Sequence, residues 1–406
     1  MKEFAAASKC SALISALLGL GLSAGCGGES SPPPQSKPDA GPPAAEVWDW
    51  HEWGLPLGYP KPKVPEDNVM SKAKVELGRY LFYDKRLSQN QTQSCASCHD
   101  PQKAFTDGRA QGLGSTGELH PRSPMSIVNV AYLSVLTWAN PLMDELEDQA
   151  LVPLFGEFPV ELGMAGHEDL LFERLSSDPK YTELFSKAFP EDEDPLRLDT
   201  LVKAIAAFER TVISYRSPWD QYTYGGKPGA LSDAAKRGKD LFFSEKLECF
   251  HCHGGFNFSD SVQHDGTTFS ETMFHNTGLY NIGGKGDYPE GGRGVHEITK
   301  LPSDMGRFRA PTLRNIALTA PYMHDGSIAT LPEVLDHYAA GGRTITEGPY
   351  AGIGSQNPYK SELIHPFMLS AAEKADVIAF LEALTDSELA SDPRLSNPFG
   401  AEGAGP

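Results

Sequence analysis

Two copies of the pattern Cys-x-x-Cys-His constrain this 406-residue chain more than any other feature of its sequence. The first copy is Cys95-Ala-Ser-Cys98-His99, and the second is Cys249-Phe-His-Cys252-His253. Two thiols at this spacing form thioethers to the two vinyl groups of one haem, and the histidine that follows binds the iron as an axial ligand. The sequence therefore predicts two covalently bound c-type haems, held by His99 and His253.

Zinc and disulfide bonds are the competing interpretations of these cysteines. Two Cys-x-x-Cys pairs can form one tetrahedral zinc site, and cysteines of exported proteins usually pair as disulfides. Neither interpretation requires a histidine directly after both pairs, and a zinc site does not require so long a separation between them. Haem attachment is therefore favoured. His251, inside the second motif, is interpreted as a spacer.

The N-terminus has the pattern of a bacterial export signal. An apolar run over residues 11–22 leads into Leu22-Ser-Ala-Gly-Cys26, which resembles a lipobox. Residues 1–25 therefore predict a signal peptide of the lipoprotein type, with ordinary secretory cleavage nearby as the alternative. Residues 26–46 are rich in Gly, Ser and Pro and predict a flexible tether. The expected location is the periplasm, with a lipidated Cys26 as the anchor to the outer membrane.

The charge balance restricts the partners of the chain. There are 54 acidic and 35 basic residues, for a formal net charge of −19. General nucleic-acid binding and adhesion to anionic lipid surfaces both need excess positive charge, so both are excluded. Contact with a membrane is expected only through the lipid anchor. An acidic surface suits a basic electron donor, although net charge alone discriminates poorly between redox partners.

Each haem motif follows a similar stretch of sequence. Residues 77–87 precede the first motif and residues 237–247 precede the second, and Gly, Leu-Phe and a final Leu coincide at equal offsets. Each stretch predicts a helix that runs to a haem-attachment turn. The sequence therefore predicts an all-α fold of two cytochrome c-like domains with one c-type haem each.

Other segments support helices joined by long loops. Apolar residues recur at helical spacing in Glu168–Ser186 and Leu198–Val212, and Ser370-Ala-Ala-Glu373 is a capping box that opens a helix through Leu384. Residues 254–311 and 340–367 are rich in Gly, Pro and Asn and predict long ordered loops, with no more than short strand pairs. The expected domains are residues 47–225 and 226–390, followed by a tail over 391–406.

The second axial ligand of a haem iron decides between ligand binding and electron transfer. Met305 and Met323 both lie in polar, loop-like sequence, where a methionine is less often core filler. Both are therefore candidate haem ligands.

From Trp48 to Leu384 the chain resembles the bacterial di-haem cytochrome c peroxidase/MauG superfamily and, within it, the MbnH enzymes of methanobactin cassettes. The motifs that carry the resemblance span the mature chain: residues 77–87 with the first haem motif, 104–108, 136–141, 146–153, 158–162, 248–253, 274–279, 308–315 and 320–327.

The resemblance implies roles for individual residues. Domain 47–225 would be peroxidatic, with peroxide reacting at the His99 haem, and domain 226–390 would transfer electrons. Met305 would be the distal ligand of the second haem, with Met323 as the second candidate. Glu161 would be the distal acid that moves a proton between the peroxide oxygens, with Glu157 as the alternative. The same resemblance places Gln149 and Pro153 in that pocket and Trp138 between the haems.

Three departures from the family pattern matter. The asparagine that binds calcium between the haems is Ser123 here, so calcium stays open. The surface tryptophan used to reach a protein substrate is Leu247. The loop histidine that plugs the first haem has no counterpart in register; His120 is displaced and is interpreted as a surface or turn residue. An open first haem is therefore expected.

The expected function is activation of hydrogen peroxide at the His99 haem. The two oxidising equivalents would spread over both haems and oxidise an aromatic residue, Trp above all, of a partner protein such as a periplasmic copper-binding protein. The first alternative is a cytochrome c peroxidase supplied with electrons by a small periplasmic redox protein. The second is a non-enzymatic di-haem electron carrier, in which Glu161 would have no role.

Overall fold

The computed structural model describes residues 48–270 and 272–400, so the predicted signal peptide and the whole of the predicted tether lie outside the described residues. The described part is mostly helical, as the sequence predicts. Its α-helices are α1 (Trp50–Trp53), α2 (Lys72–Tyr83), α3 (Cys95–Cys98), α4 (Leu146–Phe155), α5 (Glu168–Ser176), α6 (Pro179–Ala188), α7 (Leu198–Glu209), α8 (Pro218–Thr223), α9 (Asp233–Phe242), α10 (His296–Thr299), α11 (Leu331–Ala339) and α12 (Ala371–Glu382). Within the described ranges, no helix has the length and apolar character that a membrane crossing requires.

Two short antiparallel strand pairs are the only sheets among the described residues, which confirms the prediction of short strand pairs. Strand β1 (Phe274–His275) pairs with β2 (Phe308–Arg309), with Phe274 opposite Arg309. Strand β3 (Thr344–Ile345) pairs with β4 (Gly352–Ile353). The remaining connections are loops and short 3-10 turns, and the predicted loops of the C-terminal half account for most of them.

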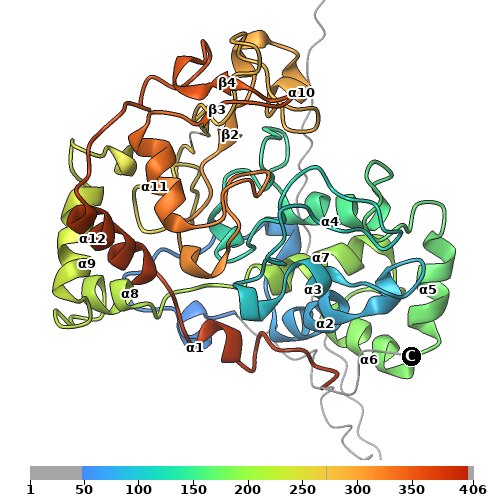
Figure 1. Cartoon of the computed structure of the whole chain (residues 1–406). Helices are drawn as coiled ribbons and strands as arrows, with labels where there is room; N and C mark the ends of the chain where they lie inside the picture. The colour runs from blue at the N-terminus through green and yellow to red at the C-terminus, as the bar shows by residue number, and fades with distance from the viewer. Residues whose placement is uncertain (1–47, 271, 401–406) are drawn as a thin grey trace, which may run out of the picture. The chain divides into compact units, whose positions relative to one another are not determined.

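The repeated glycine marks the same helix crossing in both halves. Helix α2 packs against α7, and α9 packs against α12 (Figure 1). A Cβ on Gly78 would lie 1.8 Å from the carbonyl oxygen of Ala204, and a Cβ on Gly238 would lie 1.8 Å from that of Asp376. Only glycine allows backbones to approach this closely. The glycine shared by the two stretches therefore fixes how the helix before each haem motif meets its partner.

One helical segment is broken in two. The segment 168–186, in which apolar residues recur at helical spacing, forms the two helices α5 and α6, because Pro179 has no amide hydrogen to continue the α5 ladder. Asp178 caps α6 instead, its side chain accepting from the amide of Lys180. The capping box before α12 is confirmed, with Ser370 and Glu373 bonded reciprocally, although the helix ends at Glu382 rather than Leu384.

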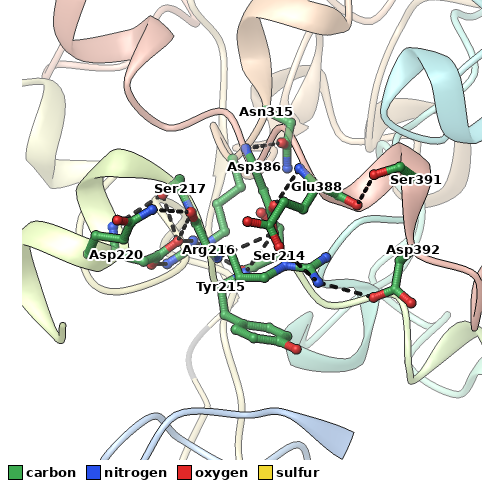
Figure 2. A network of polar contacts seen from close by, with 12 residues as sticks. Ser214, Tyr215, Arg216, Ser217, Asp220, Asn315, Asp386, Glu388, Ser391 and Asp392 are labelled. Atoms are coloured by element: carbon green, nitrogen blue, oxygen red, sulfur yellow. Dashed lines mark hydrogen bonds and ion pairs between the residues drawn. The ribbon is translucent and has the colours of Figure 1, made fainter. Parts of the chain in front are cut away.

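A buried polar network surrounds the segment that leads from α7 to α8. Figure 2 shows Arg216 between Asp386 and Asp392, at 3.3 and 3.2 Å. The side chain of Asn315 accepts from the amide of Asp386, which ties this segment to the C-terminal part of the chain. This network joins residues on both sides of the predicted domain boundary between residues 225 and 226. The network therefore does not mark a division there, and the boundary stays a prediction.

The predicted tail packs back onto the N-terminal helices. Leu395 is buried, and the hydroxyl of Tyr83 on α2 donates to its carbonyl oxygen at 2.5 Å. The first ten residues of the segment 391–406 are therefore part of the folded structure rather than an appendage.

Candidate haem sites

The first cavity gathers the predicted residues of the N-terminal half. It is lined by both cysteines and the histidine of the first motif and by the four predicted catalytic residues: Cys95, Cys98, His99, Trp138, Gln149, Pro153 and Glu161. Helix α4 presents Gln149 and Pro153. Glu157 is not among the lining residues, so the geometry favours Glu161 over Glu157 as the distal acid.

The second cavity is built around the second motif. Cys249, Cys252 and His253 line it together with Met323. Met305 does not line this cavity, so its position does not support the expected role as distal ligand. Its side chain packs in the apolar cluster, and its carbonyl accepts from the amide of Asn276 at 2.8 Å. Met323, the second candidate, lines the cavity and Met305 does not, and the ligand role of either stays a prediction.

Both motif histidines are oriented in the same way. Nδ1 of His99 lies 3.0 Å from the carbonyl oxygen of Phe105, and Nδ1 of His253 lies 3.1 Å from that of Phe258. Because Nδ1 donates to a carbonyl, the lone pair remains on Nε2, the atom that binds a metal. Burial lowers the pKa of both rings, which keeps them neutral and able to coordinate iron.

The two phenylalanines that accept these bonds share an uncommon backbone. Phe105 has φ 59° and Phe258 has φ 50°, and both side chains are fully buried. A left-handed conformation is costly for a bulky aromatic residue and persists only where the surroundings impose it. The same strained residue therefore orients the haem ligand in both halves, which the sequence motifs do not reveal.

The four motif cysteines fit thioether bonds better than disulfides or zinc. All four are free thiols. Because the two pairs line separate cavities, they cannot share one tetrahedral zinc ion. Each pair lines one cavity beside its own histidine. A haem attached to each motif fits this arrangement.

His120 lines the first cavity, although its side chain is 34% exposed and it lies in a loop, as expected of a surface or turn residue. Its Nε2 is 3.9 Å from Oε1 of Glu161, and both residues line the cavity of His99. The amide of Arg122 donates to Nδ1 of His120 at 3.2 Å, so the neutral ring carries its proton on Nε2. The pairing of Leu113 with Leu119 turns the loop back and brings His120 inward, and no local motif shows this.

Burial shapes the acid–base properties of this cavity. Burial raises the pKa of Glu161, whereas burial and the nearby Arg122 lower the pKa of His120. Glu209, which the sequence did not single out, also lines the cavity, and burial raises its pKa to about 8. The cavity therefore holds a carboxyl group that ionises at a higher pH than usual beside a neutral N–H donor.

Trp138 lines both cavities, which is the position expected of a residue between the haems. Its indole Nε1 donates to the carbonyl oxygen of Ser123 at 2.9 Å, which fixes the ring. The hydroxyl of Ser123 donates to the carbonyl of Arg109 at 3.0 Å. A calcium ion near Ser123 stays a prediction.

The second cavity also contains polar residues to which the sequence assigned no role. His324 stacks on Phe308 with ring centroids 3.7 Å apart, and burial lowers its pKa to about 4. Arg309, on β2, is buried and lines the same cavity. Leu247, where a surface tryptophan was considered, is buried in the cavity wall.

Comparison with known proteins identifies the class. The profile described as di-haem cytochrome c peroxidase matches residues 72–228. Cytochrome-c peroxidase IdrP1 of Pseudomonas sp. (strain SCT) is 36% identical, covering 84% of this chain and 88% of the relative. Methylamine utilization protein MauG of Methylorubrum extorquens is 34% identical, covering 81% and 82%. The chain belongs to the di-haem cytochrome c peroxidase and MauG family.

A solved structure is more similar still. A MauG-like protein associated with microbial copper homeostasis is 50% identical, covers 87% of this chain and 99% of its own, and superposes with a TM-score of 0.84. The protein described here is thus a haem-dependent peroxidase that acts on peroxide, and it carries two covalently bound c-type haems.

Proposed function

We propose that this enzyme uses hydrogen peroxide to oxidise an aromatic side chain, Trp above all, of a partner protein, as the MauG and MbnH enzymes do. The observation that carries the proposal is Trp138, which lines both cavities and so provides a route between the peroxide site and the second haem. The solved structure compared above is described as MauG-like and associated with copper homeostasis, which favours a periplasmic copper-binding protein as the partner.

When bound, the haems supply the iron that binds peroxide and the capacity to store oxidising equivalents. The residues of the first cavity accept and donate the protons of the reaction. Ionised Glu161 would accept a proton from one oxygen of peroxide and deliver it to the other, which would leave as water. The Nε2–H of His120 points toward Glu161 and favours its ionised form.

The electron balance defines the partner reaction. Peroxide takes up two electrons and two protons and yields two molecules of water, so the partner side chain loses two electrons. Trp138 carries these electrons between the cavities, which makes the second haem the exchange point with the partner. In this proposal residues 47–225 form the peroxidatic domain and residues 226–390 the electron-transfer domain, in the periplasm and anchored through Cys26.

The second candidate function is a cytochrome c peroxidase that detoxifies peroxide with electrons from a small redox protein. Relatives that bear this name favour it, among them cytochrome c551 peroxidase of Pseudomonas aeruginosa, 30% identical over 72% of this chain. The electron-carrier interpretation is set aside, because the chain belongs to a family of peroxidases.

A competition experiment separates the two candidates. The purified holoenzyme receives peroxide together with a reduced c-type cytochrome and a copper-binding protein that carries a surface tryptophan. The proposal predicts that the mass of the tryptophan peptide changes while the cytochrome stays reduced. Rapid oxidation of the cytochrome with an unmodified tryptophan would favour the peroxidase instead.

A further inference from the structure

Arg309 carries a buried positive charge in the second cavity. Its side chain is only 2% exposed, and it lines the cavity beside His253. The guanidinium donates to two carbonyl oxygens, of Thr137 at 3.2 Å and of Ala310 at 3.5 Å, and approaches the sulfur of Met125 at 3.6 Å. These are neutral acceptors at long distances, so the charge is poorly compensated.

No carboxylate of residues 48–270 or 272–400 forms an ion pair with Arg309. Asp260 is the carboxylate whose charge acts on Arg309, but its Oδ2 lies 2.5 Å from Nε2 of His275 and its Oδ1 forms no hydrogen bond with Arg309. Burial accordingly lowers the pKa of Arg309 to about 10. A charge removed from water without a partner is strongly unfavourable, so an anion is expected at this position.

Arg314 is a second buried arginine of this chain, and it does have a carboxylate partner. It is equally buried, and its two terminal nitrogens each lie 2.9 Å from an oxygen of Asp220. Four residues separate the two arginines, and only one of the two has a carboxylate partner. The contrast indicates that the missing anion of Arg309 comes from outside the polypeptide.

The position of Arg309 identifies that anion. Its amide donates to the carbonyl of Trp138 at 2.9 Å, and its side-chain contacts Met125 and Thr137 line the first cavity. The charge thus lies in the wall between the cavities while the residue itself lines the second. A haem brings two propionate carboxylates, and a guanidinium matches a carboxylate in charge and geometry.

We propose that Arg309 forms an ion pair with a propionate of the second haem. The pair holds that propionate beside Trp138 and keeps a fixed positive charge near the second iron. A nearby positive charge favours the reduced, less positive iron, so it raises the reduction potential of the second haem. The inference rests on the two haems of the family and not on which partner is oxidised.

Spectroelectrochemical titration of the holoenzyme tests the proposal. R309M removes the charge, R309K keeps it, and R307Q is the matched control, because Arg307 lies two residues away, is 43% exposed and reaches only Asp304. We expect R309M to lower the potential of the second haem and to make it fall further as pH rises from 6 to 8, because an unpaired propionate then titrates. R309K and R307Q should remain close to the parent protein.

Two outcomes would overturn the proposal. One is an R309M protein with both haems attached and the same potential and pH dependence as R307Q. If R309M does not mature with two haems, the resonance Raman propionate-bending bands of the parent protein and R309K decide instead. The proposal predicts that these bands shift when Lys replaces the guanidinium, and identical bands would contradict it.

Discussion

Nε2 of His120 lies 3.9 Å from Oε1 of Glu161 within the cavity that contains His99. The amide of Arg122 occupies Nδ1 of His120, so the proton on Nε2 faces the carboxylate. This separation exceeds a direct hydrogen bond but is within the range of an ion pair. The pair therefore places a proton-transferring carboxyl group beside a neutral N–H donor. This contact determines how the rate of the peroxide reaction should depend on pH.

Replacing Glu161 with glutamine should slow the reaction with peroxide without loss of haem. The carboxylate supplies general acid–base catalysis worth roughly 10²–10⁴-fold, and an amide cannot carry the proton. Stopped-flow absorbance of the ferric protein measures the rate. E157Q is the control and should react like the parent protein, because Glu157 does not line the cavity. An E161Q rate equal to that of E157Q would remove Glu161 from the mechanism.

The peroxide reaction should become faster as pH rises through the pKa of Glu161. Burial raises that pKa, so the ionised form that accepts a proton appears only above the usual carboxyl range. The other charged groups of the cavity are Glu118, Arg122 and Glu209. In H120A the loss of the N–H donor should move the midpoint of the profile to higher pH, and H120Q should restore part of the shift. A ferric H120A protein that gains a high-spin signal would instead identify His120 as an iron ligand.

A spectroscopic test decides whether Met323 or Met305 is the distal ligand of the second haem. M323A should convert the second haem from low spin to high spin, because the methionine that lines the cavity with His253 is lost. M305A should keep the low-spin signal, since Met305 is not among the residues that line that cavity. Electron paramagnetic resonance of both ferric variants measures this. The opposite pattern would restore Met305 as the ligand.

Trp138 should be needed for communication between the haems but not for peroxide binding. W138F is expected to leave the first phase of the peroxide reaction intact and to slow the optical change of the second haem, because the shared aromatic wall is altered. W219F is the control: Trp219 packs on Phe258 and Phe380 and lines neither cavity. Equal kinetics for the two variants would exclude Trp138 as the route.

The helix crossings should tolerate no side chain at the repeated glycines. G78A and G238A each place a Cβ 1.8 Å from a backbone oxygen, so the helices must separate. Overpacking of this kind costs about 1–3 kcal/mol, occasionally more. G229A is the control, because no atom lies within 4 Å of its Cβ position, and it should change the unfolding free energy by less than about 0.5 kcal/mol. Urea unfolding of the holoprotein measures all three.

The haem motifs, the shared glycines and the helical character follow from local patterns, so they could be predicted. The start of a new helix at Pro179 could also be predicted, because an Asp cap followed by Pro is typical of the first residues of a helix. His120 and Met323 could not be placed, because a loop pairing and the packing of the C-terminal loops decide which side chains face a cavity. The left-handed backbone of Phe105 and the unpaired charge of Arg309 depend on tertiary contacts that no spacing encodes.

The most direct test of the account is an optical and paramagnetic-resonance titration of the fully ferric protein with hydrogen peroxide. The account predicts rapid loss of the high-spin signal of the first haem, without prior reduction, followed by a change at the second haem and a long-lived oxidised state. A ferric protein that stays inert until one haem is reduced would contradict the MauG-like proposal and indicate a cytochrome c peroxidase.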